Sequence, residues 1–361
     1  MKNTLKTFVA VLSSLVICGS SFAGELTVNG SAETSYVIGG TNDSNSKGFG
    51  IANEMTFTAA GEFGNGYTWA SKIALDFVAS GGGADQDDTS LVLGLGDLGT
   101  VGVFVSDGGL SQELGYGIGA YAVGTDAINV GGLERGLDVS NYGNIQYHLP
   151  AILPFGMTVK AAYAPNLSSS DGNSIDEGAA IETTTNGTGI GTATAAGTDA
   201  SMYQVTAKPI DGLTVGADYF TVSGSTNVGR QSYESGNAFF KYAMGPFAIG
   251  YGKTLIAPNT TGLTGQITEY DNTQYGVQFA VNENLTVSAT KDKSERTTRA
   301  TIVAAARTAV KTKVEASVDT LAVAYNIGGA TLAVSKMESS NAGYTVNKEV
   351  DATLVSLKMA F

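Results

Sequence analysis

Gly94, Gly96 and Gly99 fit the spacing Gly-x-Gly-x-x-Gly directly after a segment that alternates like a strand. In a dinucleotide-binding site such a turn opens a helix, and the N-terminus of that helix holds the pyrophosphate. Residues 100–106 alternate as a second strand instead. The three glycines therefore indicate a hairpin turn, and we expect no cofactor.

Acid–base catalysis and metal binding have few candidate residues. His148, the only histidine, stands beside Pro150 in a short connection, and strand alternation points it toward the polar side. A Ser-His-Asp hydrolase requires a histidine next to a nucleophile, and no serine motif marks a partner here. The carboxylates of segment 165–200 lack the spacing of a calcium loop, so we favour a surface loop there. We expect no enzyme activity and no bound metal.

Residues 1–23 have the pattern of a secretory signal peptide. Lys2 and Lys6 precede an apolar stretch, and Ser21 and Ala23 place small side chains at the two positions that a signal peptidase reads. We predict that this segment is removed and that residues 24–361 form one exported domain.

The composition excludes several classes of protein. Charged residues make up 15% of the chain, whereas about 25% is usual in a soluble globular protein. No apolar run approaches the ~20 residues of a membrane-spanning helix. Removal of residues 1–23 leaves 18 basic and 33 acidic side chains. We expect no nucleic-acid partner, because phosphate binding requires clustered Lys and Arg.

From Glu25 onward, apolar and polar residues alternate with a period of two, which is the period of a strand with two different faces. Segment 273–281, for example, alternates Tyr, Val and Phe with Gly and Gln. Sixteen segments share this pattern, near 25–39, 49–63, 66–79, 89–97, 100–106, 141–149, 156–164, 201–208, 213–223, 234–244, 247–256, 268–281, 285–292, 314–326, 330–338 and 348–361.

The connections between these segments alternate in length. Short turns alternate with longer polar loops, which are predicted at 40–48, 80–88, 107–140, 165–200, 224–233, 257–267, 293–313 and 339–347. Short turns at one end and long loops at the other are typical of an outer-membrane barrel. We predict an all-β fold, a sixteen-stranded antiparallel transmembrane β-barrel enclosing an aqueous channel. The alternative is a soluble β-sandwich or β-helix, whose apolar faces would pack into a core.

Three further segments carry a resemblance to a known family. The C-terminal run 355–361 ends in Phe361 and looks like the strand by which the barrel-assembly machinery recognises Gram-negative outer-membrane proteins. Segment 94–101 resembles the strand-turn-strand that precedes the constriction loop of Gram-negative general porins, and segment 141–147 resembles the strand that follows it. The resemblance implies a trimeric diffusion channel in the outer membrane of a Gram-negative bacterium. It also implies a third long loop that folds inward and narrows the pore.

The loop in that position is 107–140. Its charged residues, which we expect at the pore constriction, are Asp107, Glu113, Asp126, Glu134, Arg135 and Asp138. In the family an acidic loop faces arginines on the opposite wall, whereas the early strands of this chain offer only Lys72. Because carboxylates in a narrow aqueous path favour cations, we predict a weakly cation-selective pore.

Strand parity also predicts which side chains of the wall point into the pore. The expected wall residues are Glu33, Glu54, Lys72, Asp76, Gln146, Lys160, Gln204, Lys208 and Asp218. Some of these would lie in hydrated vestibules above or below the constriction rather than at it. Most aromatic residues have the outward parity, although Phe104, Phe220 and Phe239 have the inward one.

Segment 291–313 is basic against the acidic background, with a local net charge of +5, and its Ala-rich part 302–310 could form a short helix. The loop could gather anionic solutes or contact lipopolysaccharide phosphates. The alternative is a solvated loop whose charges meet acidic neighbours.

Three functions remain in competition on the sequence alone. The first is a non-specific channel for passive diffusion of small hydrophilic solutes and ions. The second is a substrate-selective channel, which would show a stacked aromatic track or a dense charge ladder inside the barrel. The third is a structural or adhesive surface barrel with little conductance.

Overall fold

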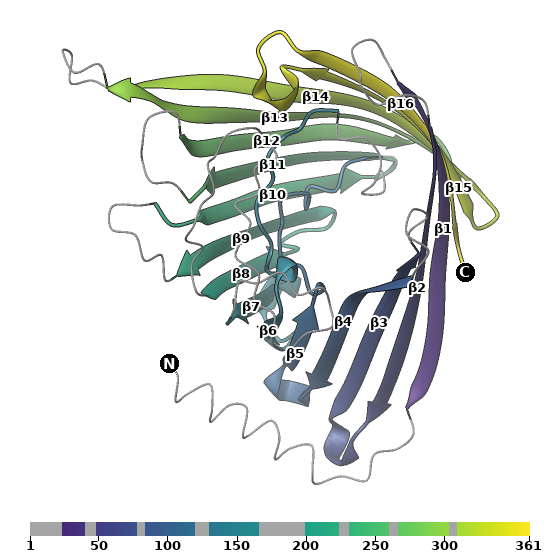
Figure 1. Cartoon of the computed structure of the whole chain (residues 1–361). Coiled ribbons are helices and arrows are strands. Elements are labelled where there is room, and N and C mark those ends of the chain that lie inside the picture. Colours follow the sequence, from purple (N-terminus) through teal and green to yellow (C-terminus); the bar gives the residue numbers. More distant parts are fainter. Residues whose placement is uncertain are drawn as a thin grey trace.

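A computed structural model describes residues 24–39, 48–77, 84–119, 130–165, 199–223, 231–259, 266–302 and 309–361. These residues form one antiparallel sheet that closes into a sixteen-stranded barrel (Figure 1). The strands are β1 (Glu25–Gly39), β2 (Gly48–Glu62), β3 (Thr68–Phe77), β4 (Ala84–Gly94), β5 (Thr100–Val105), β6 (Asn144–His148), β7 (Thr158–Ala164), β8 (Asp199–Ala207), β9 (Leu213–Ser223), β10 (Glu234–Met244), β11 (Phe247–Ala257), β12 (Ile267–Ala280), β13 (Leu285–Ile302), β14 (Ala309–Ile327), β15 (Ala330–Ser340) and β16 (Glu349–Ala360). The predicted fold class is confirmed.

Each strand pairs with its neighbour in the sequence, and β1 pairs with β16 to close the sheet. The closing register sets Ser31 opposite Ala360 and Gly39 opposite Ala352. A closed sheet leaves no unpaired strand edge, which is the condition for a sheet to cross a lipid bilayer. Within the described part of the chain, no helix is long and apolar enough to span a membrane.

The two faces of the strands differ as the alternation predicts. On β11, the side chains of Phe247, Ile249 and Tyr251 are exposed on the outside, while Thr254 is fully buried on the inside. Other exposed apolar side chains on the outer face are Tyr203, Tyr219, Val277, Leu321, Val323, Tyr325, Leu332 and Val334. Because the apolar faces point outward and do not meet in a dry interior, the β-sandwich alternative is excluded.

The connections follow the predicted alternation of short turns and long loops. Between β4 and β5 lies a single 3-10 turn, η2 (Gly96–Leu98), and Gly99 follows it at φ +89°. The Gly-rich segment is therefore a hairpin turn, as the sequence indicates, and no helix follows it. The other 3-10 turns are η1 (Gly64–Gly66), η3 (Val139–Asn141), η4 (Pro154–Gly156) and η5 (Ala342–Tyr344).

The expectation of a loop over 293–313 is wrong. β13 extends to Ile302 and β14 begins at Ala309, so most of this basic segment belongs to two strands of 18 and 19 residues. The extension is explained by the pairing of Thr290 to Arg299 with residues 311–320. Lysines and acidic residues of the two strands form ion pairs across this ladder, as in Lys293–Glu315 and Lys313–Glu295. The short helix expected at 302–310 is replaced by strand at both ends, and residues 303–308 lie outside the described part.

Candidate functional site

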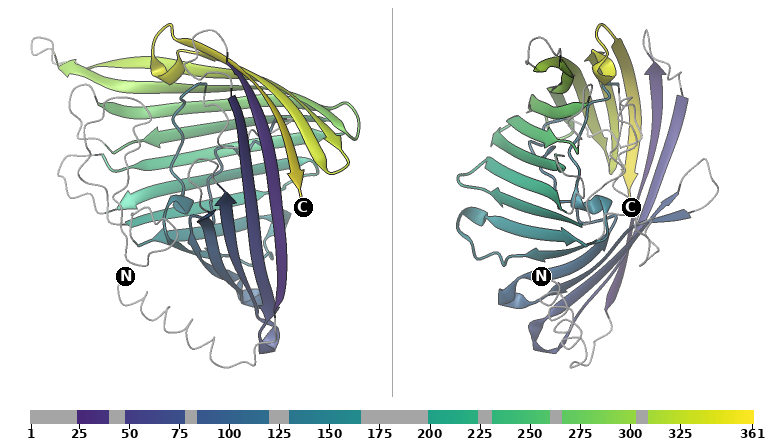
Figure 2. Two further views of the ribbon diagram at one scale, coloured as in Figure 1. Left: turned by 45° about the vertical axis from the view of Figure 1, so that its right-hand side comes forward. Right: turned by 60° about the vertical axis from the view of Figure 1, so that its left-hand side comes forward.

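The described parts of the long segment between β5 and β6, residues 106–119 and 130–143, lie on the inner side of the barrel (Figures 1 and 2). Its outgoing part, residues 107–119, follows the inner face of β8 to β12. Gln204 donates its side-chain amide to Leu110 O at 2.9 Å, and the backbone N–H of Gln112 donates to the Asp218 carboxylate. Farther along, the ammonium of Lys241 donates to Gly117 O at 2.7 Å. Inward-facing polar residues of the wall therefore hold the backbone of the segment.

Two glycines of the wall make room for the outgoing part. A Cβ at Gly250 would lie 2.6 Å from the Ile118 side chain and 2.8 Å from Tyr116 O. At Gly276 an added Cβ would again approach Ile118, at 2.9 Å. Both glycines sit on the inner side of their strands, so the wall is hollowed where the segment rests on it.

The returning part, residues 130–140, is joined to the outgoing part at its base by Asp138. The Asp138 carboxylate accepts the N–H groups of Leu110 at 2.9 Å, Ser111 at 2.8 Å and Ser140 at 3.3 Å. Three backbone N–H groups therefore occupy most of the hydrogen-bond acceptor positions of this carboxylate. Asp138 closes the base of the loop.

Glu113 and Arg135 form the central ion pair of the loop. The Glu113 side chain is only 5% exposed and lies 3.4 Å from the Arg135 guanidinium. It also accepts Gly136 N–H at 2.8 Å and the side-chain amide of Asn272 at 3.1 Å. Arg135 makes a second ion pair of 3.1 Å with Asp292 of β13. Burial alone lowers the pKa of Arg135, but these two carboxylates raise it above its usual value.

Glu134 lies beside this ion pair and has a different environment. Burial raises the pKa of its carboxyl to about 7, and the charge of Glu113 acts in the same direction. The backbone of the residue is fixed on both sides, because its N–H donates to the Tyr344 hydroxyl at 2.9 Å and its carbonyl accepts from Asn272 at 2.8 Å. A carboxyl that titrates near neutral pH therefore sits on a firmly held backbone.

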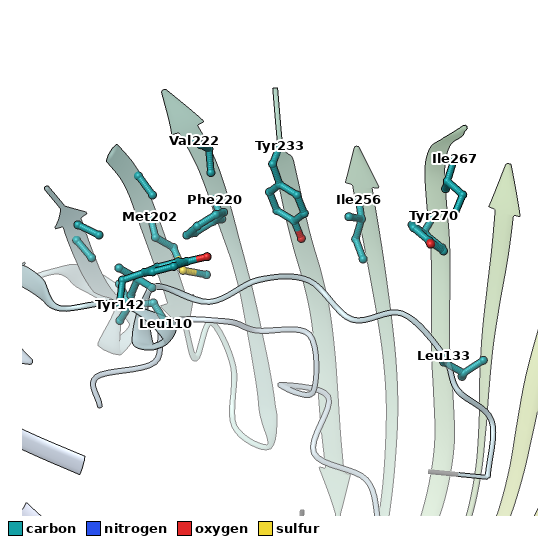
Figure 3. Close-up of a cluster of buried hydrophobic side chains, with 14 of the residues drawn as sticks. Leu110, Leu133, Tyr142, Met202, Phe220, Val222, Tyr233, Ile256, Ile267 and Tyr270 are labelled. Atoms are coloured by element: carbon teal, nitrogen blue, oxygen red, sulfur yellow. The ribbon is translucent and has the colours of Figure 1, made fainter. Parts of the chain in front are cut away.

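Apolar side chains fill the space between the loop and the wall (Figure 3). Phe220 is fully buried, with its ring 6.4 Å from Tyr142 and 5.8 Å from Tyr233. Phe104 and Phe239 are also buried, and a Cβ at Gly115 would lie 2.5 Å from the Phe239 ring. The inward aromatics noted in the sequence are therefore packing residues under the loop, and they do not form an open aromatic track.

Four predicted wall residues contact the loop directly. Gln204 and Asp218 hold its outgoing part, and Gln146 donates to Gly108 O at 2.5 Å. Lys72 reaches the base of the loop, with its ammonium 2.9 Å from Asp88 and 3.5 Å from Asp107.

The other predicted wall residues lie away from the loop contacts described above. Glu54 of β2 stands directly opposite Asp76 of β3, and its carboxylate accepts the Thr56 hydroxyl at 3.0 Å. Glu33 pairs with Lys358 across the closing seam. The remaining residues, at the short-turn end, are Lys160, which pairs with His148, and Lys208, whose N–H donates to Phe155 O at 2.8 Å.

Some expected features fall outside the described residues or contact other groups. Asp126 and the acidic segment 166–198 lie outside the described part of the chain. His148 contacts Gln146 through Nε2 at 2.8 Å and stacks on Phe104 at 6.3 Å. Among the described residues no three His, Cys, Asp or Glu side chains are grouped to hold a metal ion.

Several residues that hold the loop were missed by the sequence reasoning. Asn272 follows from the parity of β12, but nothing in the sequence pairs it with residues more than a hundred positions away. Asp292 lies within a basic segment, where its sequence neighbours give no sign of the partner it has across the barrel. Tyr344 and Tyr233 lie in connections, where alternation gives no information on direction.

Comparison with known proteins supports the architecture. No protein-family model and no curated protein matches the sequence. The solved structure of the anion-selective porin from Comamonas acidovorans superposes with a TM-score of 0.63 at 13% identity, covering 94% of this chain and 100% of that one. The chain has the porin fold.

Other solved porin-fold structures agree. The trimer form of OmpT from Vibrio cholerae has a TM-score of 0.59 at 12% identity, over 94% of this chain and 100% of that one. The outer membrane channel DcaP of Acinetobacter baumannii has a TM-score of 0.61 at 10% identity, over 96% and 100%. At these identities the likeness establishes the porin fold, and function must be argued from the residues.

Proposed function

We propose that this chain is an outer-membrane channel for passive diffusion of small hydrophilic solutes and ions. The observation that carries the proposal is the closed barrel of sixteen strands with apolar side chains outside and polar ones inside. A barrel of this size is too wide for wall side chains alone to fill, so it encloses water. The Gram-negative outer membrane is where such barrels reside, and residues 1–23 would direct export.

Loop 107–140 is the element that narrows this channel in the proposal. Its contacts with the inner wall from Leu110 to Gly117, and again at Arg135, support that role. The loop and its buried apolar packing cover the wall from β8 to β13, and Val130 of the loop packs further on, with Met337 of β15 and Leu354 of β16. Water and solutes would therefore pass on the other side, along β2 to β4.

Weak cation selectivity would come from the wall more than from the loop. The carboxylates of Glu113 and Asp138 are engaged by Arg135 and by backbone amides, and Asp107 lies near Lys72. Glu54 and Asp76 face each other on the wall that the loop leaves uncovered. Carboxylates along an aqueous path favour cations. The Comamonas acidovorans porin with the same fold is anion-selective, so selectivity must be measured for this chain.

Two partners are part of the proposal. A trimer form is described for OmpT, and we propose a homotrimer here, which chemical crosslinking in detergent would test. The outer face of β13 and β14 would meet lipopolysaccharide. Its lysines are paired with acids, as in Lys291–Asp319 at 2.6 Å and Lys293–Glu315 at 3.1 Å. This pairing favours the charge-balanced alternative over a free basic patch for anionic solutes.

Swelling of liposomes that contain the protein tests the function. Swelling in neutral sugars of small size, and its absence for larger ones, is the result expected of a diffusion channel. A structural or adhesive barrel would give no swelling with any sugar. A substrate-selective channel would admit one solute class far faster than others of equal size, but the buried Phe220 and Tyr233 give no support to an aromatic track.

A further inference from the structure

Tyr344 connects the last long loop of the barrel to the loop 107–140. It ends η5, in the connection between β15 and β16, and is 5% exposed. Its backbone has φ +58°, a left-handed conformation that a bulky side chain adopts only where surrounding contacts hold it. The neighbouring Val346, in contrast, is 63% exposed. One tyrosine of an outer connection is therefore turned into the barrel.

The hydroxyl of Tyr344 accepts the backbone N–H of Glu134 at 2.9 Å and shares a hydrogen bond of 2.6 Å with Ser294. Its ring lies under the Arg296 guanidinium, 4.7 Å from the ring centroid, and 5.5 Å from the ring of Tyr270. The ring is thus fixed by β12 and β13, and the hydroxyl is directed at the loop.

Backbone contacts reinforce the link beside Tyr344. The N–H of Gly343 donates to Gly131 O at 2.8 Å. A Cβ at Gly132 would lie 3.2 Å from Gly343 Cα, so the two chains touch through glycines. Ala342 packs with Val130 in one apolar cluster. The returning part of the loop is therefore attached to the β15–β16 connection over residues 130–134.

The position of Arg135 depends on this attachment. Glu134 is fixed by Tyr344 on its N–H and by Asn272 on its carbonyl. The next residue is Arg135, whose guanidinium bridges Glu113 and Asp292 and whose side chain is 39% exposed. Movement of Tyr344 would displace Glu134 and with it the charged group of the loop that remains partly open to the lumen.

We propose that Tyr344 is a positioning residue that holds the returning part of loop 107–140, so that the outer β15–β16 connection and the channel constriction move together. The proposal rests on the proposed channel function for its electrical readout only. The contacts that it describes exist whether or not the barrel conducts.

Tyr344→Phe is the direct test, because it removes the hydroxyl and keeps the ring against Arg296 and Tyr270. In planar-bilayer recordings we expect brief closures to become about three- to tenfold more frequent, the change that corresponds to loss of the one hydrogen bond between the Tyr344 hydroxyl and the loop, at Glu134. Ser294→Ala, which leaves the bond to Glu134, should have a smaller effect. Tyr325→Phe is the matched control, since Tyr325 is 42% exposed on the outer face of β14.

Hydrogen exchange of peptide 130–137 is measured on the same folded proteins and does not require conduction. Faster exchange in Tyr344→Phe and unchanged exchange in Tyr325→Phe would support the positioning role even if no protein conducts. Exchange equal to that of the unmodified protein would overturn it. If exchange is faster in Tyr344→Phe as expected, but neither the unmodified protein nor any variant conducts, the result would contradict the channel function and still support the positioning role. Folding of each variant is checked by heat-modifiable migration in gels.

Discussion

Phe361, the last residue of the chain, lies over Gly30 of β1 and closes the barrel there. The two residues exchange backbone hydrogen bonds, from Gly30 N to Phe361 O at 2.8 Å and from Phe361 N to Gly30 O at 2.9 Å. A Cβ at Gly30 would lie only 2.5 Å from the Phe361 ring. The Phe361 ring therefore occupies the space that a side chain at position 30 would fill.

Gly30→Val should destabilise the closed barrel by about 1–3 kcal/mol, the usual cost of inserting carbon atoms into an occupied space. Unfolding in urea, followed by the fluorescence of Trp69, measures the change. Gly64→Val is the matched control, because an added Cβ at Gly64 meets nothing within 4 Å. Equal free energies of unfolding for the two variants would show that the stability of the closed barrel does not depend on the space at Gly30.

Removal of the Glu113 carboxylate should loosen the loop. Glu113→Ala leaves Gly136 N–H without its acceptor and removes one of the two acceptors of the Asn272 side-chain amide, and an unpaired buried group costs about 1–3 kcal/mol. We expect rapid proteolysis of the loop with the barrel intact, as measured by mass spectrometry of the fragments. Glu283→Ala, at an exposed turn residue, should leave the cleavage pattern unchanged. Cleavage of both variants at the same rate would contradict the anchoring role of Glu113.

The stability of the returning part of the loop in its folded position should depend on pH because Glu134 titrates. The pKa of this carboxyl is raised to about 7 in the folded protein, first by burial and then by the charge of Glu113. Because the folded value lies above the unfolded one, the protonated form favours the folded loop, and this stability is lost as pH rises through about 7. The groups facing it are Tyr344, Tyr270 and Tyr233.

Hydrogen exchange of residues 130–137, corrected for its intrinsic rate, should therefore be slower at pH 5 than at pH 8. Glu134→Gln should remove the difference, since the amide does not titrate. Glu62→Gln, at an exposed strand end, serves as the control. A pH dependence that persists in Glu134→Gln would assign the effect to another group.

The uncovered wall should determine ion selectivity. Glu54→Gln combined with Asp76→Asn removes two facing carboxylates and should shift the reversal potential in a salt gradient toward that of a non-selective pore. Glu338→Gln is the control, because its side chain is 60% exposed on the outer face. An unchanged reversal potential in the double variant would place the selectivity elsewhere.

The barrel could be predicted because its cause is local. Alternation along β11 or β12 requires only that one face meet an apolar environment and the other a polar one, and this is written into successive residues. The alternation of β8 and β9 likewise gives the direction of Gln204 and Asp218, whose side chains contact the loop. Segment 293–313 resembles a loop because clustered basic residues such as Lys293 and Lys313 are typical of exposed connections, whereas in the structure Glu315 and Glu295 of the neighbouring strand pair with them.

The arrangement of the loop could not be predicted, because its contacts are remote in sequence. Glu113 contacts Asn272, and Glu134 contacts Tyr344, across more than a hundred residues. The types of these residues were visible, but not their partners. Thus Glu113 was expected as a charge of the constriction, while its carboxylate is 95% buried and bonded within the loop and wall.

Single-channel recording in planar lipid bilayers tests the central claim most directly. We predict discrete, long-lived conductance steps when the folded protein inserts. In a salt gradient we predict a small reversal potential whose sign shows that cations pass more readily than anions. Insertion of folded barrels with no conductance step would contradict the claim that this barrel encloses a continuous path of water.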